Sequence, residues 1–363
     1  MLRKCFVLLA ALLMSISASS QTPSPTPTSA EDTPAPAKSP ARNPNAAFKR
    51  WFDVEALAIS MRYRFVENNA GVTTNNQAQW QFNGRARFKF DRAGKYSVYA
   101  AASTGPALTS GWNNTGWGTG DGQRAIYLKQ LFFEAKPLKA VGIQIGGIGI
   151  NNGENTEVIG YDNDVYMVGE RVQFRRPQHL YFDEVSVTFG HIGDAAIPNV
   201  FRRFKRLDEW NYHQTLVRKK INNVVSFSAD YTYEAGRGTL RQAIRFKPPK
   251  GKPLDSVLFE NYEQLSPAAG YGFNIFGDKQ LWKRLTIGAG FARIDRPLLN
   301  GDRYPQGNRL YLTTNLRLSR EFSLSTALIH GVGDLPTPLT QRTRLDIILT
   351  YNILESLRKH KVL

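Results

Sequence analysis

The sequence predicts an all-β fold, a transmembrane antiparallel up-and-down β-barrel, and three observations lead to this prediction. Polar and apolar residues alternate over segments of about nine to eleven residues, the length with which a tilted strand crosses a bilayer. Short and long connections follow one another between these segments. The chain also begins with the residues of an export signal.

The alternation is clearest in residues 79–91. Apolar or small side chains from Trp80 to Phe90 occupy one set of alternate positions, and polar or charged side chains from Gln79 to Asp91 occupy the other. Successive side chains of a strand point to opposite faces, so we expect one face to meet lipid and the other the lumen. The pattern returns in residues 57–65, 225–234, 309–318 and 345–353. The mean hydropathy of -0.37 agrees with a membrane barrel, because the two faces cancel in the average.

The connections indicate the number of strands. Short connections at 91–95, 136–139 and 319–321 are interspersed with longer ones at 68–78, 105–123, 151–164, 296–307 and 331–341, and we expect the long set at the external end. The barrel has about 16 strands if residues 209–221 pair with 224–234 across Asn222-Asn223, a dipeptide suited to a tight hairpin. It has 14 strands if residues 201–220 form a loop inside the pore instead. Both totals are even and return the C-terminus to the side of the N-terminus.

The chain divides into four predicted parts. Residues 1–20 read as a signal peptide, with Arg3 and Lys4 before an apolar run and small residues before a cleavage site at Gln21. Residues 21–46 are rich in proline, alanine, serine and threonine and are expected to form a disordered periplasmic linker. The barrel is expected over 47–354, and 355–363 form a basic periplasmic tail. Cys5 is the only cysteine and precedes the cleavage site, which excludes disulfides and thiolate sites from the mature chain.

The signal peptide, the even-stranded alternation over nearly the whole mature chain and the short turns opposing long loops resemble the Gram-negative outer-membrane porins as a class, without the motif of one particular family. The resemblance implies a passive diffusion pore for small hydrophilic solutes in the bacterial outer membrane. The lipid bilayer and the barrel-assembly machinery are the implied partners. It leaves monomer and homo-oligomer open, and the residues that follow Ile353 depart from the terminal aromatic residue of many porins.

The charge of the predicted lumen favours anions. The formal net charge of the whole chain is +17, and the lumen carboxylates that can be phased (Asp91, Glu184, Asp230, Glu234 and Asp346) are fewer than the cations. A narrow pore lined by one sign of charge concentrates the opposite ion, so small anionic or polar solutes are expected. Two alternatives stay open: the arginines pair with loop carboxylates, or they form a track for acidic oligosaccharides. The predicted pore-lining cations are Arg62, Arg64, Arg85, Arg87, Lys89, Arg241, Arg245, Lys247, Arg284, Arg309 and Arg317.

No enzyme, cofactor or metal site is expected. The five histidines have no metal-ligand spacing, and the glycines of residues 142–149 lie within an alternating strand rather than before a helix. His191, Asp194 and Ser186 are residue types that could form the catalytic site of a membrane-barrel hydrolase. The favoured interpretation is that His191 is a histidine at the end of a strand without a catalytic role. The basic residues 202–206 suit phosphorylated lipopolysaccharide heads better than nucleic acid, which an exported barrel would rarely meet.

Two rival classes remain at this stage. If the connection 193–207 or the glycine-rich connection 105–123 seals the lumen, the protein is a plugged barrel with a structural or surface-interaction role. If the apolar faces meet each other in a sandwich, the chain is a secreted soluble all-β binding protein.

Overall fold

A computed structural model of the protein describes residues 50–108, 110–156, 158, 165–175, 181–194, 196–249, 251–295, 298, 305–333 and 335–360. The signal peptide and the linker expected at 1–20 and 21–46 lie outside these residues, as does the end of the expected tail. The strands are β1 (Phe52–Asn68), β2 (Thr73–Lys89), β3 (Tyr96–Thr104), β4 (Asn113–Gly118), β5 (Ile126–Leu138), β6 (Val141–Gly149), β7 (Tyr166–Arg175), β8 (Glu184–His191), β9 (Tyr212–Lys220), β10 (Val225–Glu234), β11 (Arg237–Phe246), β12 (Ser256–Ser266), β13 (Gly270–Trp282), β14 (Leu285–Ile294), β15 (Gly307–Arg317), β16 (Phe322–Val332) and β17 (Gln341–Asn352). The helices are α3 (Val200–Arg203), the 3-10 helix η2 (Phe204–Arg206) and α4 (Ile353–Lys359).

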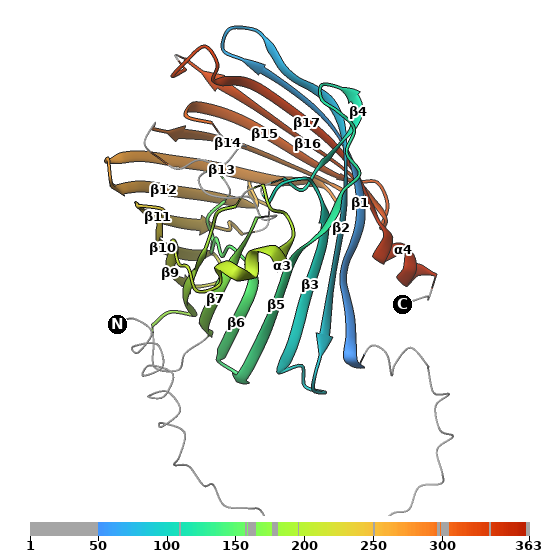
Figure 1. Ribbon diagram of the computed structural model, residues 1–363. Helices are drawn as coiled ribbons and strands as arrows, with labels where there is room; N and C mark the ends of the chain where they lie inside the picture. The colour runs from blue at the N-terminus through green and yellow to red at the C-terminus, as the bar shows by residue number, and fades with distance from the viewer. Residues whose placement is uncertain are drawn as a thin grey trace, which may run out of the picture. The chain divides into compact units, whose positions relative to one another are not determined.

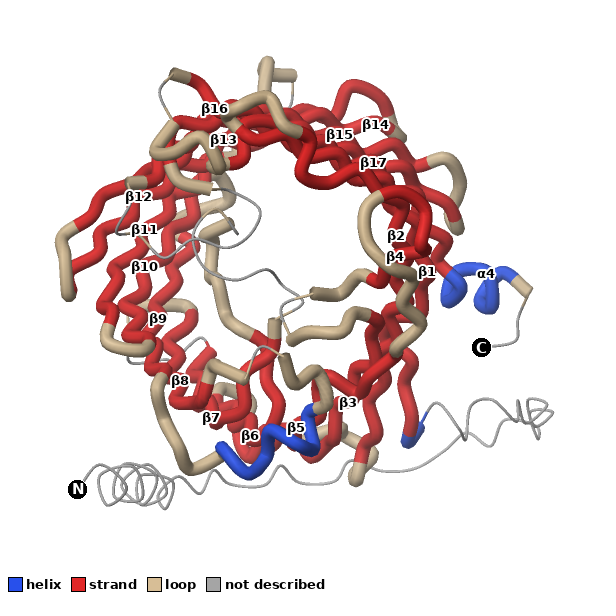
Figure 2. Tube along the Cα trace, turned by 45° about the horizontal axis from the view of Figure 1, so that its top comes forward, coloured by secondary structure: helices blue, strands red, loops and turns tan. Residues whose placement is uncertain are grey.

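All described strands except β4 close into one antiparallel barrel of 16 strands (Figure 2). Strands adjacent in the sequence pair with each other, β3 pairs with β5, and β1 pairs with both β2 and β17, which completes the ring. The short β4 pairs only with β2. The prediction of about 16 strands is therefore confirmed, and the alternative of 14 is wrong.

The β9–β10 hairpin decides between the two totals. β9 pairs with β10 from Ser226↔Lys220 to Glu234↔Tyr212. Asn222 makes the turn with its side chain, because its Oδ1 accepts hydrogen bonds from the backbone N–H groups of Val224 at 2.8 Å and Val225 at 2.7 Å. The turn is thus held by an asparagine side chain, a common turn device.

The two ends of the barrel differ. The chain enters β1 and leaves β17 at one end, here called the turn end, and the longest connections (105–125, 150–165, 192–211 and 295–306) lie at the opposite, loop end. The long loop expected at 68–78 is wrong, since β1 and β2 run on and join through a tight turn. Asn68 Oδ1 accepts hydrogen bonds from the N–H groups of Ala70 and Val72, and Gly71 adopts a φ of 77° that suits glycine.

The two faces of the wall differ as the alternation predicts. On β1, Ile59 and Met61 are 42 % and 46 % exposed, whereas Ser60 and Arg62 between and beside them are 8 % and 6 % exposed. Exposed apolar side chains outside and polar side chains inside are the reverse of a soluble protein and are typical of a membrane barrel. Other exposed apolar residues of the outer face are Phe88, Phe133, Ile145, Ile244, Phe259, Ile275, Leu310, Leu312, Leu328, Ile347 and Leu349.

The helices lie outside the ring (Figure 1). The α3 helix packs on the outer side of β6: a Cβ on Gly147 would lie 2.5 Å from Cγ2 of Val200, and Ile145, two residues earlier, is exposed on the same face. Arg203 donates a hydrogen bond to the carbonyl of Tyr166 at 2.5 Å. Residues 201–220 are therefore not a loop inside the pore. No helix among the described residues is long and apolar enough to cross a membrane.

Candidate functional site: the barrel lumen

We expected the connection 151–164 to be external, but its described residues after β6 lie against the inner side of the wall. Gln214 on β9 donates to the carbonyl of Asn151 at 2.8 Å, and Asn151 Nδ2 donates to Glu184 on β8 at 3.2 Å. Val158, further along, is buried in an apolar cluster with Tyr262, Ile294, Tyr311 and other residues of β12 to β16. Polar side chains of the wall thus bind the described first half of this connection, residues 150–156 and 158, here called the inner loop.

Glu154 is the main ionic anchor of the inner loop. Its carboxylate lies 2.7 Å from Arg218 on β9 and 2.9 Å from Arg245 on β11, and its backbone N–H donates to Ser228 Oγ at 2.8 Å. Gly153 beside it has a φ of +60°, and a Cβ there would lie 2.9 Å from both Cβ and Oγ of Ser228. The loop therefore touches the wall at a point where only glycine fits without a shift.

Two more carboxylates of the wall hold the end of the inner loop. Glu260 on β12 accepts hydrogen bonds from the backbone N–H of Thr156 at 2.5 Å, from its hydroxyl at 2.6 Å and from Asn274 Nδ2. Asp230 on β10 accepts from Asn155 Nδ2 at 3.3 Å and from Arg241 Nε at 2.9 Å. Every named carboxylate on this side of the lumen is thus engaged in the loop or in the wall.

The connection between β3 and β5 also enters the lumen, from the loop end. Lys129 on β5 donates from Nζ to the carbonyls of Ala107 at 2.9 Å and Ser110 at 2.5 Å. Leu108 is buried in a cluster with Phe132, Ile148, Val165, Tyr166, Met167, Ile192 and Tyr212. Trp112 lies 4.1 Å from the guanidinium of Arg62 on β1, and Arg62 also donates to Gln79. Part of the lumen beside β5 to β9 is therefore filled by apolar side chains.

Four of the eleven predicted pore-lining cations are ion-paired. Arg64 lies 2.7 Å from Asp346, Lys89 2.5 Å from Asp53, Arg241 2.9 Å from Asp230 and Arg245 2.9 Å from Glu154. These pairs neutralise charge on β1, β2, β10 and β11, and the pair of Arg245 with Glu154 is the pairing with a loop carboxylate that the sequence left open as an alternative.

Three further cations of the predicted set are held by uncharged groups. Arg309 is fully buried and donates to the carbonyls of Pro305, Gln306 and Gln341. Arg284 donates to the carbonyl of Leu318 at 3.3 Å. Arg62 has the contacts to Gln79 and Trp112 given above.

The remaining four cations have no ion pair within the described residues: Arg85 and Arg87 on β2, Lys247 after β11, and Arg317 at the end of β15. Arg87 donates to the carbonyl of Gly94 at 2.8 Å and lies 5.1 Å from the ring of Tyr99. The Nε atoms of Arg85 and Arg87 are buried without a hydrogen-bond partner. Arg85 and Arg87 therefore carry charge without an ion pair on β2, with the Glu55 carboxylate of β1 nearby, across the barrel from the strands that bind the inner loop.

Several lumen residues were not singled out from the sequence. Arg344 on β17 shares Asp346 with Arg64 at 2.9 Å, and Arg171 on β7 donates to Thr188 at 2.8 Å and to the carbonyl of Gly149 at 2.5 Å. Both arginines sit at alternate polar positions of their strands, so a fuller phasing of β7 and β17 could have found them. Glu154 carries no such signal, because its connection has no strand period.

The hydrolase components are not brought together. Ser186 and His191 lie on opposite faces of β8, since they are five residues apart on one strand. Asp194 contacts Arg206 at 3.4 Å, and His191 Nδ1 lies 3.2 Å from the carbonyl of Glu209. Within the described residues, no group of three or more histidine, cysteine, aspartate or glutamate side chains could hold a metal ion.

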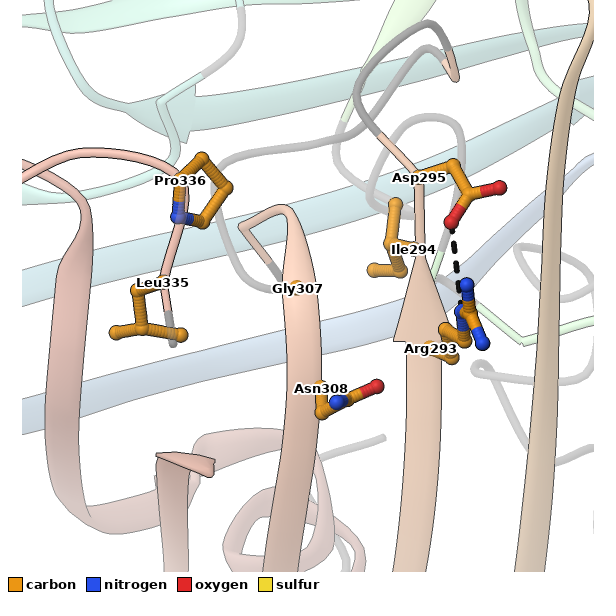
Figure 3. A pocket seen from close by; sticks show the side chains of 7 residues that line it. All are labelled: Arg293, Ile294, Asp295, Gly307, Asn308, Leu335 and Pro336. Carbon is orange, nitrogen blue, oxygen red and sulfur yellow. Dashed lines mark hydrogen bonds and ion pairs between the residues drawn. The ribbon is translucent and has the colours of Figure 1, made fainter. Parts of the chain in front are cut away.

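A cavity of about 490 Å³ lies at the loop end, between β14, β15 and the connection after β16. Figure 3 shows its lining, in which Arg293 and Asp295 face each other at 3.4 Å. The cation is thus already paired, and the other lining side chains are Ile294, Asn308, Leu335 and Pro336. This cavity offers shape but little charge to a solute.

Comparisons with known proteins reveal the fold. No family model and no curated protein matches the sequence. Among solved structures, variants of the porin of Rhodopseudomonas blastica are 12 % identical with a TM-score of 0.54, over 83 % of this chain and 99 % of theirs. OprB of Pseudomonas putida is 12 % identical with a TM-score of 0.57, over 84 % of this chain and 94 % of its own. The chain therefore has the fold of the bacterial porins, a closed antiparallel barrel of 16 strands.

Proposed function

We propose that the protein is an outer-membrane porin through which small hydrophilic solutes diffuse passively, with a preference for anions. One observation carries the proposal, namely the division of charge in the lumen. Asp230 on β10 and Glu154 on the inner loop are ion-paired and Glu260 on β12 accepts hydrogen bonds, whereas Arg85 and Arg87 on the opposite wall have no ion pair within the described residues. A water-filled passage between these walls would have a positive side, which concentrates anions.

The same fold supports the proposed setting of the pore. The exposed apolar outer face suits the lipid bilayer, with the turn end in the periplasm and the long connections outside. Export would use the signal peptide at 1–20, followed by cleavage and folding by the barrel-assembly machinery. Arg202 and Lys205 are exposed on α3 and η2 at the outer wall, where phosphate groups of lipopolysaccharide would meet them.

Ion selectivity tests the proposal. Purified protein in a planar bilayer should give conductance steps of stable size, and a KCl gradient should give a reversal potential of anion-selective sign. The double variant Arg85→Gln/Arg87→Gln should move that potential toward zero, because it removes the positive charges without a carboxylate partner. The control Arg202→Gln/Lys205→Gln removes the same charge from the outer wall, outside the lumen, and should stay close to wild type. A cation-selective wild type, or equal effects of both variants, contradicts the anion preference.

A plugged barrel is the second candidate, and the apolar cluster around Leu108 is the observation that favours it. Leu108, Phe132 and Met167 occupy lumen space that water and solutes would otherwise use. If this cluster and the inner loop together seal the barrel, folded protein inserts into bilayers without conductance steps. Slower migration of boiled than of unboiled protein in a gel shows in either case that the barrel is folded.

A further inference from the structure

A second cavity of about 300 Å³ lies on the inner wall toward the turn end, away from the inner loop. It spans strands from both sides of β3, with Glu55 from β1, Arg85 from β2 and Tyr99 from β3. The other lining residues come from β5, β6 and β7: Gln130, Phe132, Glu134, Lys136, Gln144 and Arg175. Its volume is at the lower limit of pockets that hold small molecules.

Arg85 is the cation of this cavity that lacks a partner. Lys136 is bound to Glu134 at 2.5 Å, and Arg175 donates to Gln173 at 3.0 Å. Arg85 has no ion pair or side-chain hydrogen bond among the described residues, and its Nε is buried and unsatisfied. A guanidinium without a counter-charge favours an anion that reaches its terminal N–H groups. A guanidinium fork matches the two oxygens of a carboxylate.

The rest of the lining selects among anions. Glu55 is exposed, and its carboxylate opposes a doubly charged phosphate more than a monoanion, whereas the charge of Glu134 is compensated by Lys136. A monoanion therefore meets the Arg85 guanidinium and is opposed less. When a monoanion is bound, the Glu55 carboxylate can accept hydrogen bonds from the hydroxyl groups of that ligand.

Aromatic and amide groups complete the lining. The rings of Tyr99 and Phe132 are stacked at 4.8 Å with an interplanar angle of 5°, and Tyr99 is fixed by its hydroxyl, which donates to Glu134 at 3.3 Å. Gln130 lines the cavity with an amide that makes no hydrogen bond within the described part of the chain. Rigid aromatic rings and the unbonded amide of Gln130 suit a ligand with C–H surface and several hydroxyl groups.

We propose that this cavity is a binding subsite for a small hydroxylated monocarboxylate, of the sugar-acid class, with Arg85 holding the carboxylate and Gln130 and Glu55 the hydroxyl groups. The inference rests on the proposed pore only for how the solute arrives. A neutral sugar would leave the Arg85 fork without a partner, and acetate would leave the amide and Glu55 unused. The subsite therefore discriminates by charge and by hydroxyl groups together.

Calorimetric titration of the purified, folded barrel in detergent tests the subsite with three probes: gluconate, glucose and inorganic phosphate. Gluconate should bind at least ten-fold more tightly than either of the others. Arg85→Gln should weaken gluconate binding by about 10- to 100-fold, the loss expected for a hydrogen bond to a charged group. Arg317→Gln, which removes a lumen-wall charge outside the cavity, should leave gluconate affinity unchanged.

Glu55→Gln provides a change in the opposite direction. Removal of this carboxylate should strengthen phosphate binding, which a merely structural role of the residue would not do. The proposal is overturned if gluconate gives no binding heat, if phosphate binds wild type as well as gluconate, or if Arg85→Gln leaves gluconate affinity unchanged. Bilayer conductance in KCl separates the two proposals: conductance without gluconate binding rejects only the subsite, and gluconate binding without conductance rejects only the pore.

Discussion

Asp346 shows how one carboxylate organises the inner wall. Its two oxygens bind Arg64 on the neighbouring strand at 2.7 Å and Arg344 on its own strand at 2.9 Å, and all three side chains are largely buried. Two buried guanidinium groups thus share this counter-charge. A buried ion pair contributes little relative to an apolar replacement, but loss of one partner leaves an uncompensated charge.

We therefore expect Asp346→Asn to destabilise the barrel by about 3 kcal/mol, the lower end of the range for a broken buried pair, because lumen water relieves part of the cost. The measurement is the urea midpoint followed by the gel shift of unboiled protein. Asp121→Asn, in the connection after β4, should change the unfolding free energy by less than about 0.5 kcal/mol. Equal midpoints for both variants would mean that the pairs at Asp346 contribute nothing.

For a single residue, the sequence predicts the face of the strand to which the side chain points better than it predicts the groups that the side chain contacts. The period of two places Arg64, Arg85 and Arg309 on one face of their strands, because side-chain direction is a local property. What each side chain meets depends on segments far away in the chain. Arg309 resembles a free lumen charge in the sequence, yet carbonyls from its own connection and from β17 surround it.

The inner loop is one of two connections that enter the lumen, and Gly153 sets how closely it approaches the wall. Gly153→Ala should push the loop off β10 into the passage, so single-channel conductance should fall and current noise should rise. Gly71→Ala is the matched control: it has the same left-handed backbone, at a cost of about 1 kcal/mol, but its Cβ meets no atom within 4 Å. A conductance change of the same size in both variants would trace the effect to backbone strain alone.

Helix α4 is fastened to the turn end by Glu321. Lys359 Nζ lies 2.7 Å from the Glu321 carboxylate and Ser319 donates to it at 2.8 Å, and these contacts lower the pKa of Glu321 from 4.5 to about 2. A lowered folded-state pKa stabilises the native state above the ordinary value, and this contribution is lost as the pH falls through about 2.

Lys359→Met should raise the pKa of Glu321 toward its ordinary value, while the Ser319 hydrogen bond keeps part of the shift. A carbon-detected NMR titration of the glutamate carboxyl in detergent micelles measures it. Arg358→Met, one residue earlier, removes a contact to Glu355 instead and should leave the Glu321 titration unchanged. An unchanged pKa in Lys359→Met would show that α4 is not held by this contact.

Strands in which polar and apolar residues alternate could be predicted from the sequence, whereas connections without such alternation could not. β2 and β17 have a polar and an apolar face, and their existence followed from that. The inner loop reads Asn-Asn-Gly-Glu-Asn-Thr, which a solvent-exposed loop could equally contain. Its inward course is fixed by Ser228, Arg245 and Glu260 on strands that come later in the chain, and no local pattern encodes that match.

For the whole molecule, the number of strands could be predicted because it had to be even and because one hairpin, β9–β10, decided between the two even totals. Both ends of an even-stranded barrel lie on one side, and the pairing of β9 with β10 then chose 16 over 14. The lengths of the connections were less predictable. At Asn68, for example, the structure has a tight turn where we expected a long connection. Backbone hydrogen bonds extend a strand into polar sequence when its neighbour offers partners.

The seam between β1 and β17 has a consequence for how the protein comes into being. The hydroxyl groups of Ser60 and Thr350 lie 2.9 Å apart across this seam, although 290 residues separate them in the sequence. Contacts between such distant residues form late and slowly, since the intervening chain must first be ordered. A chain that ends before β17 is therefore not a smaller barrel. It is an open sheet with two unpaired edges, and such edges pair with other chains.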